Sequence, residues 1–158
     1  GTVINSLALQ SNLKKLGVES RVMTAISINR VAEPYIKNKA SNHLEKNRVV
    51  IFAAGTGNPF FSTDTAAALR ASEMSCSKII KATKVNGIYD SDPKINSNAK
   101  LIKEISYTEV INKNLRVMDL TAISLAKESN LPIYITNIFD ENSLIRTLKE
   151  EGNYSKIN

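Results

Sequence analysis

Short apolar runs rich in β-branched residues alternate with amphipathic segments along most of this chain. "RVVIFAA" (48–54) is typical of a strand buried on both faces, and "LPIYITNI" (131–138) is the last such run. Helical segments separate the runs, for example from about Asp64 to Met74. Strands separated by helices form a largely parallel sheet with helices on both faces. We therefore predict an α/β fold, and the 158 residues favour a single domain, 1–158.

The composition excludes several classes of protein. No apolar run is long enough to cross a bilayer. The single cysteine, Cys76, rules out an intramolecular disulfide and fits a reducing cytoplasm. Cys76 and the only histidine, His43, do not suffice for a four-ligand zinc site, so we expect no protein-bound metal.

The net charge of +6 indicates anionic partners. Many basic residues stand next to acidic ones, as in "LEKNR" (44–48), and only 6% of residues are aromatic. A platform for stacking nucleic-acid bases is therefore poorly supported. Nucleotides or other small phosphates fit the charge better, and we expect neither a nucleic-acid nor a membrane partner.

The stretch "AAGTGNPFFSTDTAAALRA" (53–71) is the first unusual feature. Gly55 and Gly57 allow close approach of a ligand to the backbone, and hydroxyl side chains follow them. The helix that starts near Thr63 or Asp64 directs free N–H groups at this loop, an arrangement that suits a phosphate. The alternative is a plain turn in which Ser62, Thr63 or Asp64 only caps the helix.

The stretch "KATKVNGIYDSDP" (81–93) is the second. Thr83 ends a strand, and Asn86-Gly87 is a hairpin signal. Tyr89 could stack on a flat heterocycle, while Asp92 could accept a hydrogen bond from a ribose or a base. The alternative is an exposed hairpin with solvated charges.

The two stretches occur in order with "SYTEVI" (106–111), "LRVMDLTAISLAKESNLPI" (115–133) and "TNI" (136–138). This set of blocks resembles the bacterial uridylate kinases of the amino-acid-kinase superfamily. The resemblance implies a three-layer α/β sandwich with a mainly parallel sheet. It also implies a transferase that moves the γ-phosphoryl group of ATP to UMP with Mg²⁺, forming UDP in pyrimidine nucleotide biosynthesis.

The same resemblance assigns the site residues. Asp64 matches an acidic catalytic residue behind the phosphates, and Thr83, Tyr89 and Asp92 would hold ATP. The expected UMP-binding residues form one continuous segment: Thr56, Gly57, Asn58, Pro59, Phe60, Phe61, Ser62 and Thr63.

The family further implies a cytoplasmic homo-oligomer, usually a hexamer, with allosteric activation by GTP and inhibition by UTP. Arg21 and Arg48 match positions associated with GTP at the subunit interface. Gln10 stands where some members have arginine.

Two family motifs are missing from the 158 residues, a Lys-x-Ser-Gly phosphate loop and a Gly-Gly-Gly-Asn turn. We therefore expect the chain to correspond to about the C-terminal two-thirds of the family, without its N-terminal portion. The 158 residues by themselves should then bind nucleotides weakly and lack catalysis. An alternative from another class is a non-catalytic nucleotide-binding or regulatory module that keeps the uridine pocket.

Overall fold

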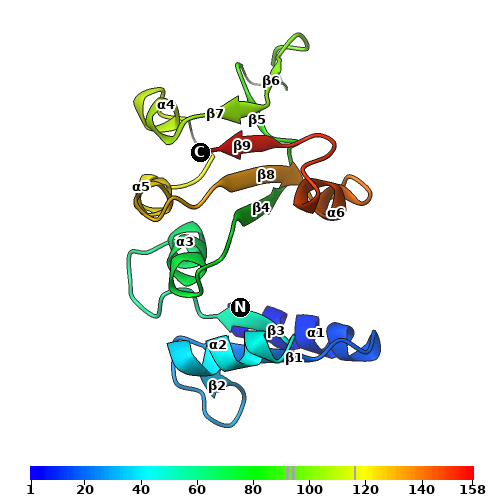
Figure 1. Ribbon diagram of the computed structural model, residues 1–158, viewed down its shortest axis with the longest axis vertical. Helices are drawn as coiled ribbons and strands as arrows, with labels where there is room; N and C mark the ends of the chain where they lie inside the picture. The colour runs from blue at the N-terminus through cyan, green and yellow to red at the C-terminus, as the bar shows by residue number, and fades with distance from the viewer. Residues whose placement is uncertain (92, 94, 116) are drawn as a thin grey trace. The chain divides into compact units, whose positions relative to one another are not determined.

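The computed structural model describes residues 1–91, 93, 95–115 and 117–158 and divides into two compact units (Figure 1). Unit 1 is Gly1–Met74 and unit 2 is Ser75–Asn158. Both combine helices with strands, all paired in parallel in unit 1 and in mixed directions in unit 2, so the predicted α/β class is confirmed. No helix in the described parts of the chain is both long and apolar enough to span a bilayer.

Unit 1 contains three strands and three helices. They are α1 (Thr2–Lys15), β1 (Ser20–Thr24), β2 (Glu33–Pro34), α2 (Lys37–Glu45), β3 (Val49–Ala53) and α3 (Thr63–Glu73). The strands form a parallel sheet in the order β2-β1-β3. Helix α1 packs against β1 and β3, and α2 packs against β3. Because β1 and β3 run parallel, the loops after Thr24 and Ala53 both leave the sheet at the carboxyl ends of the strands.

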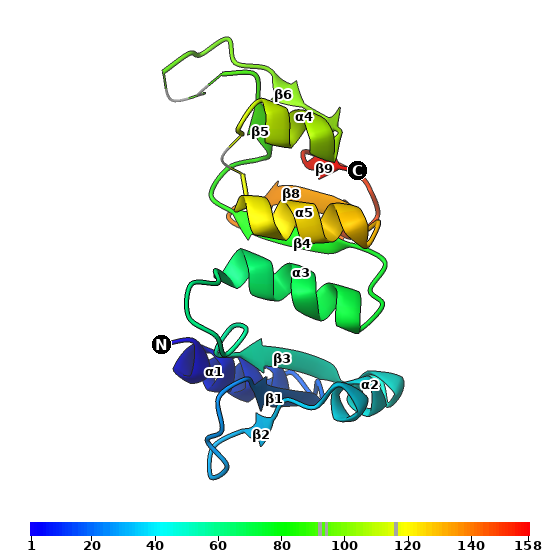
Figure 2. The same cartoon turned by 90° about the vertical axis from the view of Figure 1, so that its left-hand side faces the viewer.

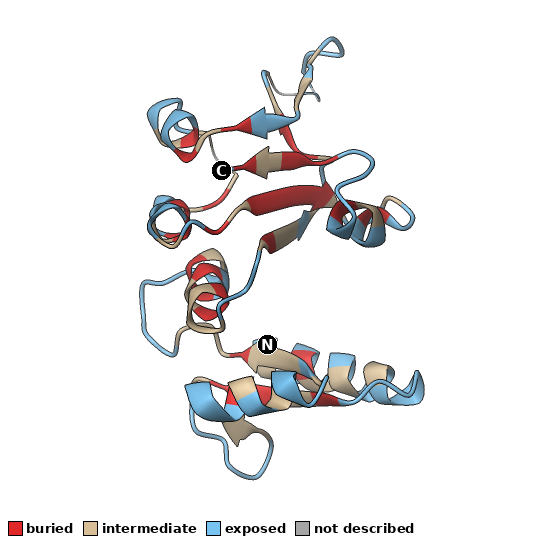
Figure 3. Cartoon of the chain, viewed as in Figure 1, coloured by how far each residue is buried: buried red, intermediate tan, exposed pale blue. Residues whose placement is uncertain are grey.

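The prediction that "RVVIFAA" is buried on both faces is wrong. Within β3 only Ala53 is buried; Val49 is exposed and residues 50–52 are half-buried (Figure 3). The physical reason is that β3 is the end strand of its sheet and pairs only with β1. A continuous apolar run therefore identified the strand but not its environment.

Unit 2 is built on a four-stranded sheet in the order β4-β8-β9-β7 and a separate two-stranded hairpin, β5-β6. The elements are β4 (Ile79–Thr83), β5 (Ile88–Tyr89), β6 (Leu101–Ile102), β7 (Glu104–Ile105), α4 (Tyr107–Asn112), α5 (Leu120–Glu128), β8 (Ile133–Asn137), α6 (Ser143–Leu148) and β9 (Ser155–Ile157). Figures 1 and 2 show α5 on one face of the sheet and α6 on the other.

Strand β8 forms the centre of the core of unit 2. Residues 133–136 are all buried, between parallel β4 and antiparallel β9. The C-terminal strand β9 was not predicted, because three residues in "NYSKIN" are too few to show a strand period. "LPIYITNI" is therefore not the last strand.

Candidate functional site

The loop between β3 and α3 has an unusual backbone. Ala54, Gly55, Gly57 and Phe60 all have positive φ, between 62° and 79°. Residues 57–63 are exposed, and Asn58 N–H donates to Thr56 Oγ1 at 3.1 Å. Because bulky L-residues rarely adopt this conformation, Phe60 holds local strain. The loop is thus a sharply turned, exposed segment at the carboxyl end of β3.

Gly57 is required by space as well as by conformation. A Cβ at this position would lie 3.0 Å from the carbonyl oxygen of Ala25 and 3.1 Å from its Cβ. Ala25 follows β1, and its N–H donates to the carbonyl of Ala53 at 3.1 Å. Ala25 was not identified from the sequence, since nothing local marks it as the neighbour of the loop.

Ser62 is the N-cap of α3, and its Oγ accepts a hydrogen bond from Thr65 N–H at 3.1 Å. The helix begins at Thr63, and Asp64 lies half-buried in the first turn. A carboxylate there interacts favourably with the positive end of the helix dipole. Ser62, Thr63 and Asp64 were the three N-cap candidates from the sequence, and Ser62 is the residue that caps the helix. Asp64 is therefore not the N-cap.

Phe60 is fully exposed and Phe61 is largely exposed. Adjacent aromatics after a strand are usually core residues, and here they are not. The aromatic contact in this part of the unit is instead made by Phe52, whose ring packs edge-on against Tyr35 at 5.6 Å. Phe60 and Phe61 are therefore available to a ligand or another surface.

The C-terminal half of α3 is held by a cluster of three side chains, called here the α3 clamp: Tyr35, Arg70 and Glu73. Arg70 Nη1 lies 2.6 Å from Glu73 Oε2, and Tyr35 Oη donates to the same oxygen at 2.5 Å. The Arg70 guanidinium stacks 3.7 Å from the centre of the Tyr35 ring. Burial opposes ionisation of Glu73, but these two partners outweigh it and lower the pKa of Glu73 below 4.5.

In unit 2, the carboxyl ends of β4 and β8 lie side by side, with Thr83 paired to Asn137. Thr83 Oγ1 accepts from Val85 N–H at 3.1 Å and so shapes the turn after β4. Asn137 Nδ2 donates to Asn86 Oδ1 at 3.1 Å, which links the two loops. Asn86 and Asn137 were not among the predicted site residues, although the "TNI" block contains Asn137.

Tyr89 lies half-buried on β5, paired with Leu101 of β6. Asp90 closes the long loop: its Oδ1 accepts from Lys100 N–H at 2.9 Å and from Ser91 Oγ at 3.1 Å. The Lys100 hydrogen bond is the main cause of its lowered pKa. Asp92, the third predicted ATP residue, lies outside the described residues.

The interpretation of Asn86-Gly87 as the hairpin turn is wrong. The hairpin pairs β5 with β6, so residues 90–100 connect its strands and Asn86-Gly87 precedes it. Gly87 does not have the positive φ that such turns need. It is glycine because a Cβ there would lie 2.3 Å from Ser155 Oγ.

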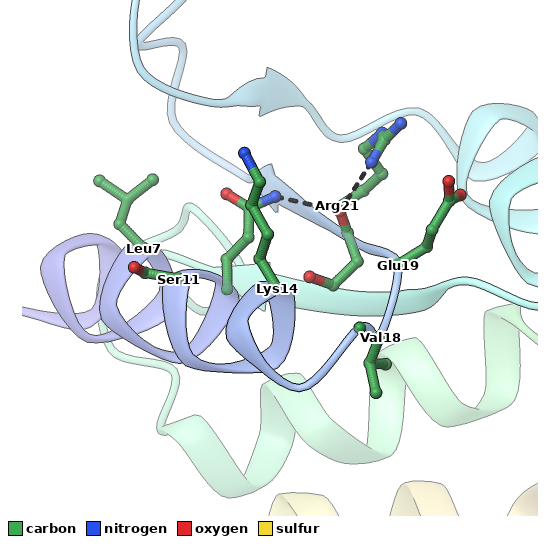
Figure 4. A pocket seen from close by; sticks show the side chains of 9 residues that line it. Leu7, Ser11, Lys14, Val18, Glu19 and Arg21 are labelled. Carbon is green, nitrogen blue, oxygen red and sulfur yellow. Dashed lines mark hydrogen bonds between the residues drawn. The ribbon is translucent and has the colours of Figure 1, made fainter.

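A pocket of about 630 Å³ lies between α1 and the start of β1 (Figure 4). Gln10, Lys14 and Arg21 line it, together with Glu19. Gln10 Nε2 donates to the carbonyl of Ser20 at 3.1 Å, which ties the helix to the strand. The structure thus places Arg21 at a cavity with mixed charge.

Arg48 does not line this pocket but joins the same charged network. Its Nε lies 2.7 Å from Glu19 Oε2, which lowers the pKa of Glu19, and its Nη1 lies 3.2 Å from His43 Nδ1. His43 Nε2 lies 3.2 Å from Glu33 Oε2, and Arg21 Nε lies 3.8 Å from Glu33 Oε1. Glu33 and His43 therefore connect the two arginines.

Titratable groups do not gather into a metal site in the described residues: no group of three or more His, Cys, Asp and Glu occurs there. Asp64 is the acidic residue of the loop-and-helix region 53–71. Any divalent cation at this loop would take most of its ligands from a bound substrate and water.

The chain matches the family model of the amino acid kinase family over residues 1–137. It belongs to the amino acid kinase family. Family members similar to it include the uridylate kinases of Neorickettsia sennetsu, 51% identical, and Rickettsia canadensis, 53% identical. Each alignment covers 99% of this chain, and 67% and 64% of the relatives respectively. The resemblance to uridylate kinases expected from the sequence blocks is confirmed.

Crystal structures from the same family agree with this assignment. The UMP kinase of Ureaplasma parvum matches with a TM-score of 0.95 at 39% identity, and that of Bacillus anthracis with 0.93 at 41%. The matches cover 99% of this chain and 67% and 65% of those chains. This member of the family thus spans about two thirds of the length of its relatives.

Proposed function

We propose that this chain functions in a uridylate kinase, an enzyme that transfers the γ-phosphoryl group of ATP to UMP and forms UDP in pyrimidine nucleotide biosynthesis. The observation that carries the proposal is the β3–α3 loop. This exposed loop, rich in hydroxyl side chains, leads directly into the capped start of α3 in a chain whose relatives are uridylate kinases. Phosphoryl transfer relies on positioning and charge stabilisation, so no nucleophilic side chain is required.

In this proposal the loop from Thr56 to Thr63 binds UMP. The positive φ at Gly57 and Phe60 turns the backbone sharply. Helix α3 begins directly after the loop, and the positive end of its dipole suits the phosphate of a nucleotide. Phe60 and Phe61, which are exposed, offer faces to the base or ribose.

Thr83 and Tyr89 bind ATP in the same proposal, and Asp92 completes the set. Thr83 ends β4 at the edge where ligands of parallel sheets bind. Tyr89 lies half-buried on a short hairpin, so that part of its ring is open to stack on adenine.

Mg²⁺ enters this proposal as a companion of ATP. When bound, it would neutralise charge on the transferred phosphoryl group. Asp64 fits as a group that orients a lysine or a metal-bound water, because it lies half-buried at the start of α3 directly after the UMP loop. The remaining ligands would be phosphate oxygens and water.

The proposal extends to regulation in a cytoplasmic hexamer, with GTP as activator and UTP as inhibitor. Arg21 lines the pocket of Figure 4 with Lys14, and Arg48 is linked to Arg21 through His43 and Glu33. Guanidinium groups are well suited to phosphate oxygens. An effector would have to displace Glu19 from Arg48, since the two form a 2.7 Å ion pair.

Asp64→Asn tests the enzyme directly. Any UDP formation from UMP and ATP by the unmodified chain, followed in a coupled assay, is expected to fall about tenfold in Asp64→Asn, as is typical when an orienting group is removed. UMP affinity should change little, because asparagine has the same shape. Because the 158 residues by themselves are expected to lack catalysis, UMP binding by calorimetry without UDP formation would favour a nucleotide-binding module over an enzyme for this chain.

Tyr89→Ala tests the division of the site between two substrates. We expect the ATP dissociation constant to rise about tenfold, the value of one lost stacking contact. UMP affinity should stay within about twofold, because Tyr89 is not among the residues proposed to contact UMP. Calorimetric titration with each nucleotide measures both. An equal loss of both affinities would show that the loops are wrongly assigned.

A further inference from the structure

Strand β9 carries a buried hydroxyl that the kinase proposal does not use. Ser155 is fully buried, and its Oγ bonds to both strands of the β5-β6 hairpin. It accepts from Ile88 N–H at 2.7 Å and donates to the carbonyl of Ile102 at 2.5 Å. Residues 138–158 lie beyond the part of the chain that the family model matches.

The hairpin is a sheet of its own, separate from the β4-β8-β9-β7 sheet. Ile88 and Ile102 are directly paired across it. Ser155 therefore links the hairpin to β9 through its side chain: one hydroxyl accepts from a donor on β5 and donates to an acceptor on β6. Figures 1 and 2 show the hairpin next to β9.

Gly87 makes this contact possible. A Cβ at Gly87 would lie 2.3 Å from Ser155 Oγ and 2.9 Å from Ser155 N. No L-residue with a side chain fits there unless the hairpin moves away from β9. The close approach and the two hydrogen bonds thus fix the start of β5 against the main sheet.

Tyr89 is the next residue after Ile88, so the anchored N–H lies one residue from the proposed ATP contact. We infer that Ser155 is a positioning residue for ATP: its hydroxyl holds β5 where Tyr89 meets the nucleotide. This inference rests on the proposed function of Tyr89. Removing the hydroxyl leaves the buried Ile88 N–H and the half-buried Ile102 carbonyl without this partner, and pairing them elsewhere requires the hairpin to shift.

The test compares Ser155→Ala with Ser155→Thr, which keeps a hydroxyl, and with Thr136→Val. Thr136 is a fully buried residue on β8 whose hydroxyl donates to the Asn153 carbonyl at 3.4 Å rather than to a hairpin residue. Calorimetry on the whole chain gives the affinities for ATP and UMP. Amide hydrogen exchange at Ile88 reports the anchor without any nucleotide.

Ser155→Ala is expected to raise the ATP dissociation constant about fivefold and to speed amide hydrogen exchange at Ile88 about tenfold. Changes of this size are expected from the loss of one buried hydrogen bond. UMP affinity should hold, Ser155→Thr should retain most of the ATP affinity, and Thr136→Val should lower the melting temperature only.

An unchanged ATP affinity in Ser155→Ala would overturn the inference, whatever happens to the melting temperature. An equal weakening of ATP and UMP, matched by Thr136→Val, would overturn it as well and identify a general loss of stability. Failure of the unmodified chain to bind ATP is a different result. It would remove the proposed role of Tyr89 and, with it, the positioning role.

Discussion

Alanine in place of Gly57 is expected to raise the dissociation constant for UMP about 30-fold, which corresponds to about 2 kcal/mol. An L-residue at the observed φ of 79° costs about 1 to 2 kcal/mol. The new Cβ would also lie 3.0 Å from the Ala25 carbonyl oxygen, which is too close without a shift. The free loop would relax to another conformation, and UMP would have to restore the binding one.

Gly55→Ala is the matched control for this prediction. Gly55 also has a positive φ, 62°, but within the described residues no heavy atom outside its neighbours lies within 4 Å of the added Cβ. It should therefore show only the conformational part of the loss. Titration calorimetry with UMP compares the two variants. Equal losses would mean that the approach to Ala25 does not matter, and no loss in either would mean that the loop does not bind UMP in this conformation.

Much of the fold could be predicted because its signals are local. The alternation of apolar runs with amphipathic segments gave the α/β class. Ser106 and Glu109 form a capping box at the start of α4, and their three-residue spacing is visible in the sequence alone. The two glycines of the 53–71 stretch marked an unusual loop, and both do have positive φ. These features depend on residues within about four positions of one another.

Features set by distant residues were missed or misread. Gly87 looked like half of an Asn-Gly turn, whereas its need for glycine comes from Ser155, far along the chain. The burial of β3 depends on its place at the sheet edge, which an apolar run does not encode. The α3 clamp joins Tyr35 to Glu73 across 38 positions, so no local pattern announces it. Such contacts have to be read from the fold.

The α3 clamp is expected to account for a large part of the stability of unit 1. Glu73→Ala should lower the free energy of unfolding by about 2 kcal/mol, less than for breaking a fully buried pair, because Glu73 is partly open to solvent. The Arg70 side chain is 10% exposed and keeps its charge, whereas that of Glu73 is 30% exposed. Arg70→Met should cost only about 1 kcal/mol, because the buried charge is removed and Glu73 retains Tyr35 and water. Urea unfolding followed by circular dichroism measures both, since the chain has no tryptophan.

The double variant decides whether the clamp acts as a unit. If Arg70 and Glu73 depend on each other, Glu73→Ala combined with Arg70→Met will lose about 1 to 2 kcal/mol less than the sum of the single losses. The pH dependence of stability gives a second test of the clamp. The pKa of Glu73 is lowered from 4.5, so the charged form of Glu73 stabilises the fold above pH 4.5. That stability is lost as the pH falls through the lowered pKa. The difference between the unmodified chain and Glu73→Gln should shrink in that acidic range. Two results would contradict a joint action: additive losses in the double variant, and a stability difference between the unmodified chain and Glu73→Gln that does not change with pH. Arg70, Glu73 and Tyr35 would then hold α3 independently of one another.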